Sequence, residues 1–386
     1  MILPRPNYCP ASGEEFIDMA KMQVNDDGVI RTFKKMQVND NGVIRTLKKV
    51  QINDNGVIRT IFKKEVEFTK LPDPAALPVG LGYGVSFSAD GKFMAVAHST
   101  TPFVTIYSIN GNTFTKLPDP SVLPAGLGYG VSFSADGKFM AVAHSISPFL
   151  TIYSISGNTF TKLPNPSSLP ANGGLGISFS ADSKFMAVAH STTPFVTIYS
   201  ISGNTFTKLP DPTDLPAGTC YGVSFSADGK FMAVAHDTSP RITIYSISGN
   251  TFTKLSNPSS LPAGTGRGVS FSADGKFMAV AHLTSPFLTI YSINGNTFTK
   301  LPNPSSLPAG FGYGVSFSAD GKFMAVAHLT SPFLTIYSIS GNTFTKLPDP
   351  ADLPTGASYG VSFSADCEFM AVAHSISPFL TIYKIE

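Results

Sequence analysis

Hydrophobic and polar positions along most of the chain form short, separate runs. A typical stretch, residues 68–113, holds four runs rich in β-branched and aromatic residues: GVSFS, KFMAVAH, FVTIYSI and TFTKL. Such residues are enriched in packed, pleated strands. The apolar positions in FMAVA are nearly continuous, which is typical of a strand covered on both faces. The pattern therefore predicts four short strands in this stretch.

Turn residues separate the runs. Asp90-Gly91 lies between the first two and Asn110-Gly111-Asn112 between the last two, where glycine can adopt positive φ. Prolines and glycines recur every few residues, so no window remains for a helix of several turns. We therefore expect an all-β chain.

The same 46-residue unit occurs seven times. The motif FTKL begins at Phe68 and returns every 46 residues up to Phe344, with no insertion or deletion. Four strands per unit in seven units are typical of a β-propeller. We predict a seven-bladed β-propeller with four-stranded blades over residues 65–386. The chain enters it through a fourth-type strand, 66–71, and ends with a third-type strand, so the entering strand should complete the last blade.

A shorter repeat precedes the propeller. A 14-residue segment begins at Lys21 and occurs three times, each copy reading as strand, Asn-Asp-x-Gly turn and strand. We predict three β-hairpin repeats over 21–64, after an extended tail over 1–20. Residues 21–64 contain ten Lys and Arg against four Asp, a net charge of +6, whereas 65–386 have a net charge of −2. A lone hairpin is marginally stable in water, so this region is expected to need a partner surface.

Composition narrows the function classes. Hydrophobic residues make up 42% of the chain and charged residues only 13%, which excludes a disordered chain. The net charge of +2 gives no reason to expect nucleic acid or membrane partners, and no apolar run could span a bilayer. The first residues contain Pro4 and Pro6 and no apolar core, so no signal peptide is expected. Three cysteines, Cys9, Cys220 and Cys367, are expected to be free thiols.

At SFSADGKFMAVAH and FVTIYS the units resemble the WD-repeat and YVTN-type propeller families. They depart from the WD pattern, because Tyr107-Ser108 stands where Trp-Asp would and no Gly-His pair precedes the blade. That family's hydrogen-bonded tetrad is therefore not carried over. The longer sequence motif, from FTKLP through SPFxTIY, is similar to that of propellers in tailed-phage and prophage proteins. The VNDxGVxR motif of the 14-residue repeats resembles short repeats of phage structural proteins. The resemblance implies a virion protein, made in the host cytoplasm.

Differences between the units gather on one side of the predicted ring. The link before the first strand and the loop after the second strand vary, whereas the SADGK and I-(N/S)-G-N-T turns hardly change. Because strands alternate in direction, the two variable segments emerge on one face, here called the top face. The constant turns emerge on the opposite, bottom face. Loops tolerate drift on any face, but the constant turns barely drift, which favours ligand binding by the top face.

Candidate ligand-binding residues lie on the top face. Aromatic faces with nearby hydroxyls suit the apolar side of sugar rings. The alternative is that the tyrosines plug the channel while a second series, of phenylalanines, packs between blades. The fourth unit contains Asp214, Asp237 and Arg241, with Arg267 and Asp352 expected nearby, so the dominant site is expected there. The side chains of Tyr221, Arg241 and Arg267 are expected to be largely exposed. The predicted ligand-binding residues are Tyr83, Tyr129, Tyr221, Arg241, Arg267, Tyr313, Tyr359, Asp214, Asp237 and Asp352.

All seven histidines occupy one repeat position, from His98 to His374. A metal needs three or four ligands within about 2.3 Å of one point, whereas adjacent blades lie about 10 Å apart. We therefore expect each histidine to be buried and hydrogen-bonded, and we expect no metal and no cofactor. Near-identical blades also provide no unique set of nucleophile, base and oxyanion donors, so no catalytic residues and no enzyme are expected.

These observations predict a non-enzymatic bacteriophage surface or tail protein located on the virion. Residues 1–64 would contact other virion proteins, and the top face would bind a host cell-surface ligand, expected to be a glycan. The alternative is a structural or decoration protein whose propeller contacts other virion subunits. A third class is a sugar- or lactone-processing enzyme. Homo-oligomerisation stays open.

Overall fold

The computed structural model describes residues 37–40, 43–46, 49–54, 57–63 and 66–386. The chain divides into two compact units, residues 1–66 and 67–386. Every regular element in the described ranges is a strand, and no helix there is long and apolar enough to cross a membrane.

The second and third 14-residue repeats each form an antiparallel hairpin. β1 (Gln37–Asp40) pairs with β2 (Val43–Thr46), and β3 (Lys49–Asp54) pairs with β4 (Val57–Lys63). The first repeat and the predicted tail over 1–20 lie outside the described residues, as does Cys9.

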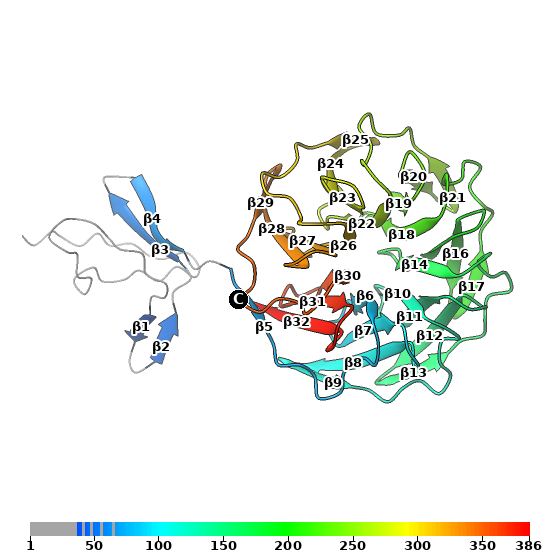
Figure 1. Cartoon of the computed structure of the whole chain (residues 1–386), viewed down its shortest axis with the longest axis horizontal. Helices are drawn as coiled ribbons and strands as arrows, with labels where there is room; N and C mark the ends of the chain where they lie inside the picture. The colour runs from blue at the N-terminus through cyan, green and yellow to red at the C-terminus, as the bar shows by residue number, and fades with distance from the viewer. Residues whose placement is uncertain (1–36, 41–42, 47–48, 55–56, 64–65) are drawn as a thin grey trace, which may run out of the picture. The chain divides into compact units, whose positions relative to one another are not determined.

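Residues 67–386 form seven four-stranded antiparallel sheets, arranged as blades around a central channel (Figure 1). The innermost strands of blades 1 to 7 are β6 (Gly82–Phe87), β10 (Gly128–Phe133), β14 (Gly174–Phe179), β18 (Cys220–Phe225), β22 (Gly266–Phe271), β26 (Gly312–Phe317) and β30 (Ser358–Phe363). The second strands are β7 (Phe93–His98), β11 (Phe139–His144), β15 (Phe185–His190), β19 (Phe231–His236), β23 (Phe277–His282), β27 (Phe323–His328) and β31 (Phe369–His374). The prediction of an all-β, seven-bladed propeller is confirmed.

The outer half of each blade contains the remaining two strands. The third strands are β8 (Val104–Asn110), β12 (Leu150–Ser156), β16 (Val196–Ser202), β20 (Ile242–Ser248), β24 (Leu288–Asn294), β28 (Leu334–Ser340) and β32 (Leu380–Ile385). The outer strands are β9 (Thr113–Lys116), β13 (Thr159–Lys162), β17 (Thr205–Lys208), β21 (Thr251–Lys254), β25 (Thr297–Lys300), β29 (Thr343–Lys346) and, in blade 7, β5 (Phe68–Lys70).

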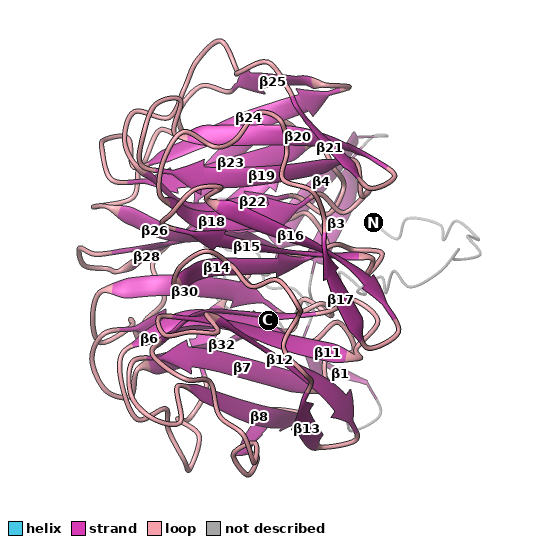
Figure 2. Cartoon of the chain, turned by 90° about the vertical axis from the view of Figure 1, so that its right-hand side faces the viewer, coloured by secondary structure: helices cyan, strands magenta, loops and turns pink. Residues whose placement is uncertain are grey.

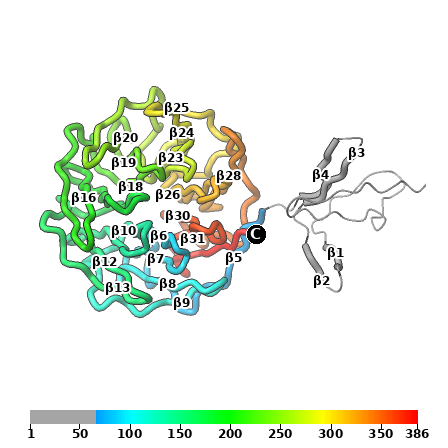
Figure 3. Tube along the Cα trace, turned by 180° about the vertical axis from the view of Figure 1, so that it is seen from behind, coloured from blue at the N-terminus to red at the C-terminus, as the bar shows by residue number. Residues whose placement is uncertain are grey.

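The ring closes as the phase of the repeats predicts. β5, the first strand of the propeller, pairs antiparallel with β32, the last strand of the chain (Figures 1 and 3). The strand covers Phe68–Lys70, which is shorter than the predicted 66–71, but Leu71 N–H still donates to the Ile382 carbonyl at 2.8 Å. Phe68 lies in the core between blades 6 and 7 and meets Phe323 edge-on at 5.5 Å.

The two faces are built as predicted (Figure 2). On the top face, the loop after the second strand is tied to the link before the first strand by Ser99 N–H, which donates to the Leu81 carbonyl at 3.0 Å. On the bottom face, Ile109 N–H donates to the Lys92 carbonyl at 2.8 Å and joins the two constant turns. Variable and constant segments therefore lie on opposite faces.

The hydrophobic core lies between blades rather than inside one sheet. In β7, Phe93 and Ala95 pack against blade 2, whereas Met94 and Val96 pack in the cluster that includes blade 7. Phe93 meets Phe160 of blade 2 edge-on at 5.3 Å. A second strand is thus apolar on both faces, which explains the continuous FMAVA run in the sequence.

The SADGK turn is held by its own side chains. Ser88 Oγ donates to Asp90 Oδ1 at 2.7 Å and accepts from Phe93 N–H at 2.9 Å, and Gly91 adopts φ +69°. Ser183 and Cys367 take the glycine position in blades 3 and 7, with φ +57° and +58°.

Both replacements gain a bond that glycine cannot form. Ser183 Oγ accepts from Asp136 N–H at 3.0 Å, and Cys367 Sγ accepts from Asp320 N–H at 3.2 Å. In each case the donor belongs to the turn of the preceding blade. This bond offsets part of the cost of the left-handed backbone.

Removing β5 should destabilise the whole ring. Without it β32 has an unpaired edge and the core loses Phe68, a loss of about 3 kcal/mol for the side chain alone. We expect a chain that begins at residue 73 to melt at least several degrees below one that begins at residue 65, as measured by calorimetry. Equal melting temperatures would contradict this closure.

Candidate ligand-binding site

A β-bulge in each innermost strand defines the candidate site. In β6, Gly82 pairs with His98 and Gly84 with Ala97, so Tyr83 has no partner residue in β7. The same shift occurs in all seven blades. Bulges bend a strand and redirect one side chain. The bulged residues are Tyr83, Tyr129, Leu175, Tyr221, Arg267, Tyr313 and Tyr359.

These seven residues are here called the bulge ring, and all but Leu175 are joined by side-chain contacts at the top-face end of the channel. Tyr83 lies between Tyr129 and Tyr359, with ring centroids 5.2 and 5.4 Å away, and Tyr359 meets Tyr313 at 5.2 Å. Arg267 continues the sequence of contacts between Tyr313 and Tyr221. The structure thus brings together all five predicted tyrosines and one predicted arginine.

The ring residues are less exposed than the sequence led us to expect. Tyr221, Arg241 and Arg267 are each half-buried, and the expectation of largely exposed side chains is wrong for all three. Mutual packing covers Tyr221 and Arg267. Burial also raises the pKa of Tyr83, and its tyrosine neighbours Tyr129 and Tyr359 add to the effect.

The other predicted charged residues do not form one cluster. Asp237 and Arg241 share the loop after β19 in blade 4, where Asp237 Oδ1 accepts from Thr238 Oγ at 2.9 Å. Asp214 is exposed in the link before β18, and Asp352 is exposed in the link before β30, three blades further along the ring. Because Asp352 belongs to blade 7, it does not contribute to a site on blade 4.

Arg241 replaces the phenylalanine that six blades have at this loop position. It adopts φ +72°, and the six phenylalanines adopt φ between +64° and +67°. The six are Phe103, Phe149, Phe195, Phe287, Phe333 and Phe379. Phe195 packs against the core between blades 3 and 4, in agreement with the packing alternative for this series.

Apolar side chains on the top face are unevenly distributed. Within the propeller's described residues, the exposed large hydrophobic side chains other than Val66 all lie in top-face links and loops of blades 6, 7, 1 and 2. They are Leu307, Phe311, Ile376, Val79, Leu81, Val122 and Ile146. Blades 3, 4 and 5 expose none of this kind among the described residues. We call this patch the apolar arc; it was not found from the sequence because exposure depends on the fold.

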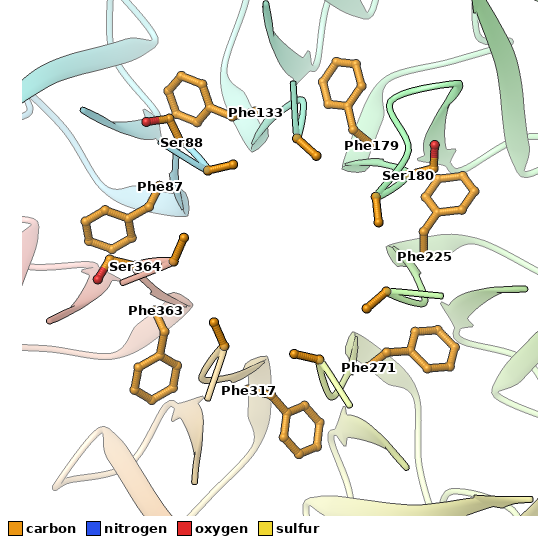
Figure 4. A pocket seen from close by; sticks show the side chains of 17 residues that line it. Phe87, Ser88, Phe133, Phe179, Ser180, Phe225, Phe271, Phe317, Phe363 and Ser364 are labelled. Atoms are coloured by element: carbon orange, nitrogen blue, oxygen red, sulfur yellow. The ribbon is translucent and has the colours of Figure 1, made fainter. Parts of the chain in front are cut away.

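The side chains that line the channel below the bulge ring carry no charge. A cavity of about 190 Å³ is lined by one glycine and one Val or Ile from each innermost strand, Gly84 and Val85 in blade 1. A second, of about 330 Å³, lies at the bottom-face end among phenylalanines and alanines. Figure 4 shows the rings of Phe87, Phe133 and their equivalents pointing away from the opening. These positions are the same in every blade, so the bottom opening lacks the variation seen at the top.

Each histidine is buried and hydrogen-bonded, as predicted. His98 Nε2 lies 2.9 Å from Thr105 Oγ in the neighbouring strand, and the pair is repeated in every blade. Burial lowers the pKa of each of the seven to about 4. No group of three or more His, Cys, Asp or Glu in the described ranges could hold a metal ion.

The sequence did not reveal the role of the third-strand tyrosine. Tyr107 is fully buried, and its hydroxyl donates to the Ala76 carbonyl at 2.9 Å, in the link that leads into the blade. Equivalent bonds in the other blades include Tyr245 to Asp214 and Tyr383 to Asp352. These tyrosines hold the top-face links in place from below. The strict repetition of Tyr in FxTIYS was the available signal.

Comparisons with known proteins support the fold. A family model described as "Lactonase, 7-bladed beta-propeller" matches residues 205–303, about a quarter of the chain. The chain is a seven-bladed β-propeller. Among solved structures it is similar to a chain of Kuenenia stuttgartiensis Hydrazine Synthase, with a TM-score of 0.63 and 18% identity over 81% of this chain and 97% of that one. Such low identity shows the fold alone. No curated protein matches the sequence.

The buried histidines should make the propeller sensitive to acid. In the unfolded chain histidine has a pKa near 6.5, whereas in the folded chain it is about 4. Between these values the unfolded chain binds more protons, so stability falls as pH falls, by up to about 1.4 kcal/mol per pH unit for each histidine. Urea unfolding should give a nearly constant free energy from pH 7 to 8.5 and a steep decrease from pH 6.5 to 4. A flat profile across that acidic range would rule out this effect.

The cysteines should differ in reactivity. Cys220 is fully buried at the start of β18, and burial raises the pKa of its thiol. Cys367 is half-buried in a bottom-face turn, and neither cysteine forms a disulfide. Thiol titration of native protein should detect Cys367 but not Cys220. Titration of denatured, unreduced protein should find three thiols per chain; finding one would reveal an unexpected disulfide.

Proposed function

We propose that this chain is a bacteriophage virion protein whose propeller binds a host cell-surface glycan through its top face. Residues 1–64 would attach it to other virion proteins. A phage origin is supported by the sequences of the 46-residue and 14-residue repeats, which resemble those of phage proteins. The binding role is supported by the geometry of the bulge ring.

The proposal rests on one observation: the bulged position of the innermost strand is also a position at which the units differ in sequence. In every blade one residue is turned out of the strand ladder at the top-face end of the channel. Five of these are tyrosines, whose rings provide flat apolar surface and whose hydroxyls form hydrogen bonds, as sugar recognition requires. The substitutions Leu175 and Arg267 make the ring unequal, which suits one defined ligand orientation.

Two other functions have a specific observation in their favour. The apolar arc favours a structural or decoration protein, because exposed apolar patches mark protein contacts. The partial match to a lactonase model favours a lactone-processing enzyme. Hydrolysis of a lactone panel with added divalent metal ions would support the enzyme. Burial of the apolar arc in the assembled particle would support the structural role.

Adsorption of the purified chain to host cells or host polysaccharide tests the proposal. Tyr221→Ala, Arg241→Ala and Arg267→Ala, alone and combined, should reduce adsorption, and we expect the triple variant to lose at least about tenfold, the effect of 1.4 kcal/mol. Calorimetry should accompany each variant, since Tyr221 and Arg267 pack on each other and their removal also costs stability.

Matched controls lie on the bottom face. Lys230 and Lys276 are exposed and pair with Asp228 and Asp274 at 3.1 Å. Such surface pairs contribute little to stability, so Lys230→Ala and Lys276→Ala should adsorb normally. If the triple variant also adsorbs normally, or if the wild-type chain binds nothing from the host, the structural role becomes the better account.

A further inference from the structure

Arg267 is the one charged residue of the bulge ring. It takes the position that five other blades fill with tyrosine and blade 3 fills with leucine. The bulge turns it out of the β22 ladder, between Tyr221 of blade 4 and Tyr313 of blade 6. The charge therefore lies at the mouth of the channel, among aromatic side chains.

The guanidinium group is held by stacking. Its Cζ lies 3.8 Å from the ring centroid of Tyr221 and 5.2 Å from that of Tyr313. Stacking on an aromatic ring uses the flat face of the guanidinium and leaves its N–H donors, which point outward in the plane, free for other bonds. The orientation of the donors is thus fixed before any ligand arrives.

Those donors have no acceptor within the described part of the chain. The Arg267 side chain takes part in none of the side-chain hydrogen bonds or ion pairs there, and its buried Nε has no partner. Its terminal nitrogens are not among the buried unpaired atoms, so they remain accessible. By contrast, the bottom-face lysines are paired, for example Lys230 with Asp228. Leaving a partly desolvated cation without an acceptor costs free energy.

An anion with two oxygens in one plane would satisfy the two accessible terminal nitrogens, while the buried Nε lies out of its reach. A carboxylate accepts two parallel N–H bonds from arginine, which are stronger than neutral hydrogen bonds. The cavity below the ring, of about 190 Å³, is lined by glycine and Val or Ile and offers no charged side chain. The anion would therefore bind at the mouth, beside Arg267, rather than inside the channel.

We infer that the top-face mouth of the channel is a binding site for a carboxylate, with Arg267 as its anchor and Tyr221 as the plane that positions it. Together with the proposed function, on which this part rests, the site selects acidic sugars such as uronic acids over neutral ones. The tyrosines of the ring would contact the sugar, and Arg267 would donate hydrogen bonds to its carboxylate.

Titration of the full chain with sodium glucuronate, followed by NMR or calorimetry, tests the site. The neutral methyl ester of glucuronate is the matched probe. We expect the wild-type chain to bind the acid at least about tenfold more tightly than the ester, and to lose this preference as salt rises. Equal binding of the two, or no binding of the acid, would overturn the inference.

The chain itself supplies the best variant. Arg267→Tyr introduces the residue that five other blades have at this position, so the bulge and the ring contacts are kept while the charge is removed. It should melt close to wild type and lose the preference for the acid. Arg267→Lys keeps the positive charge but loses the paired N–H donors of the guanidinium, so it should keep only part of the preference for the acid. Lys276→Gln, a cation on the bottom face outside the proposed binding residues, should behave like wild type; if it abolishes the preference instead, the anchor is misassigned.

The two proposals can fail separately. If the wild-type chain prefers glucuronate but adsorbs to no host material, the carboxylate site stands and the host-binding role does not. If the chain adsorbs to host polysaccharide and Arg267→Tyr adsorbs equally well without any acid preference in either, the host-binding role stands and the carboxylate site is refuted.

Discussion

The ring depends on how closely neighbouring innermost strands approach one another at a single glycine in each blade. A Cβ at Gly84 would lie 2.9 Å from the carbonyl oxygen of Tyr129, and one at Gly176 would lie 2.5 Å from that of Tyr221. Contacts this short do not occur for real side chains, so any larger residue would push the strands apart. Six of the seven blades have such a contact; the exception is Gly130, where a Cβ would lie 3.3 Å from Gly176 Cα and Ile177 N. In those six blades the carbonyl that meets the glycine belongs to the bulged residue of the next blade, so the same contact limits the spacing of the strands and places the bulge ring.

The overall fold could be predicted from the sequence because the 46-residue unit is repeated seven times without insertion or deletion. The distance from one FTKL to the next fixed the number of blades, and the offset between the two ends fixed the closing strand, β5 beside β32. The buried histidines followed from their regular spacing and the geometry of a ring. Each of these inferences needs only the order of residues along one unit, which local patterns record well.

The site could be predicted only in part. The sequence identified the variable face and the tyrosine series, but not that a bulge at Tyr83 and its equivalents turns them toward one another, because the bulge depends on the pairing register with the second strand. Exposure was overestimated for Arg267 for the same reason: its cover comes from Tyr221, 46 residues earlier in the chain. Asp352 was grouped with blade 4 by its charge, whereas its place in the ring is set by its unit number. Comparing the units with one another gives no information on the contacts between units.

The closing strand also determines how the propeller would respond to force. Any tension transmitted along the chain from the N-terminal unit enters the ring at Glu67 and β5, which are held to the last strand by backbone bonds such as Leu71 to Ile382 and Glu386 to Glu67. The other outer strands continue through tight turns into their own blades, so they cannot be peeled away separately. Blade 7 is thus the mechanical weak point of an otherwise uniform ring. A pull strong enough to detach three residues would strip the outer strand from blade 7 while the other six blades kept all four strands.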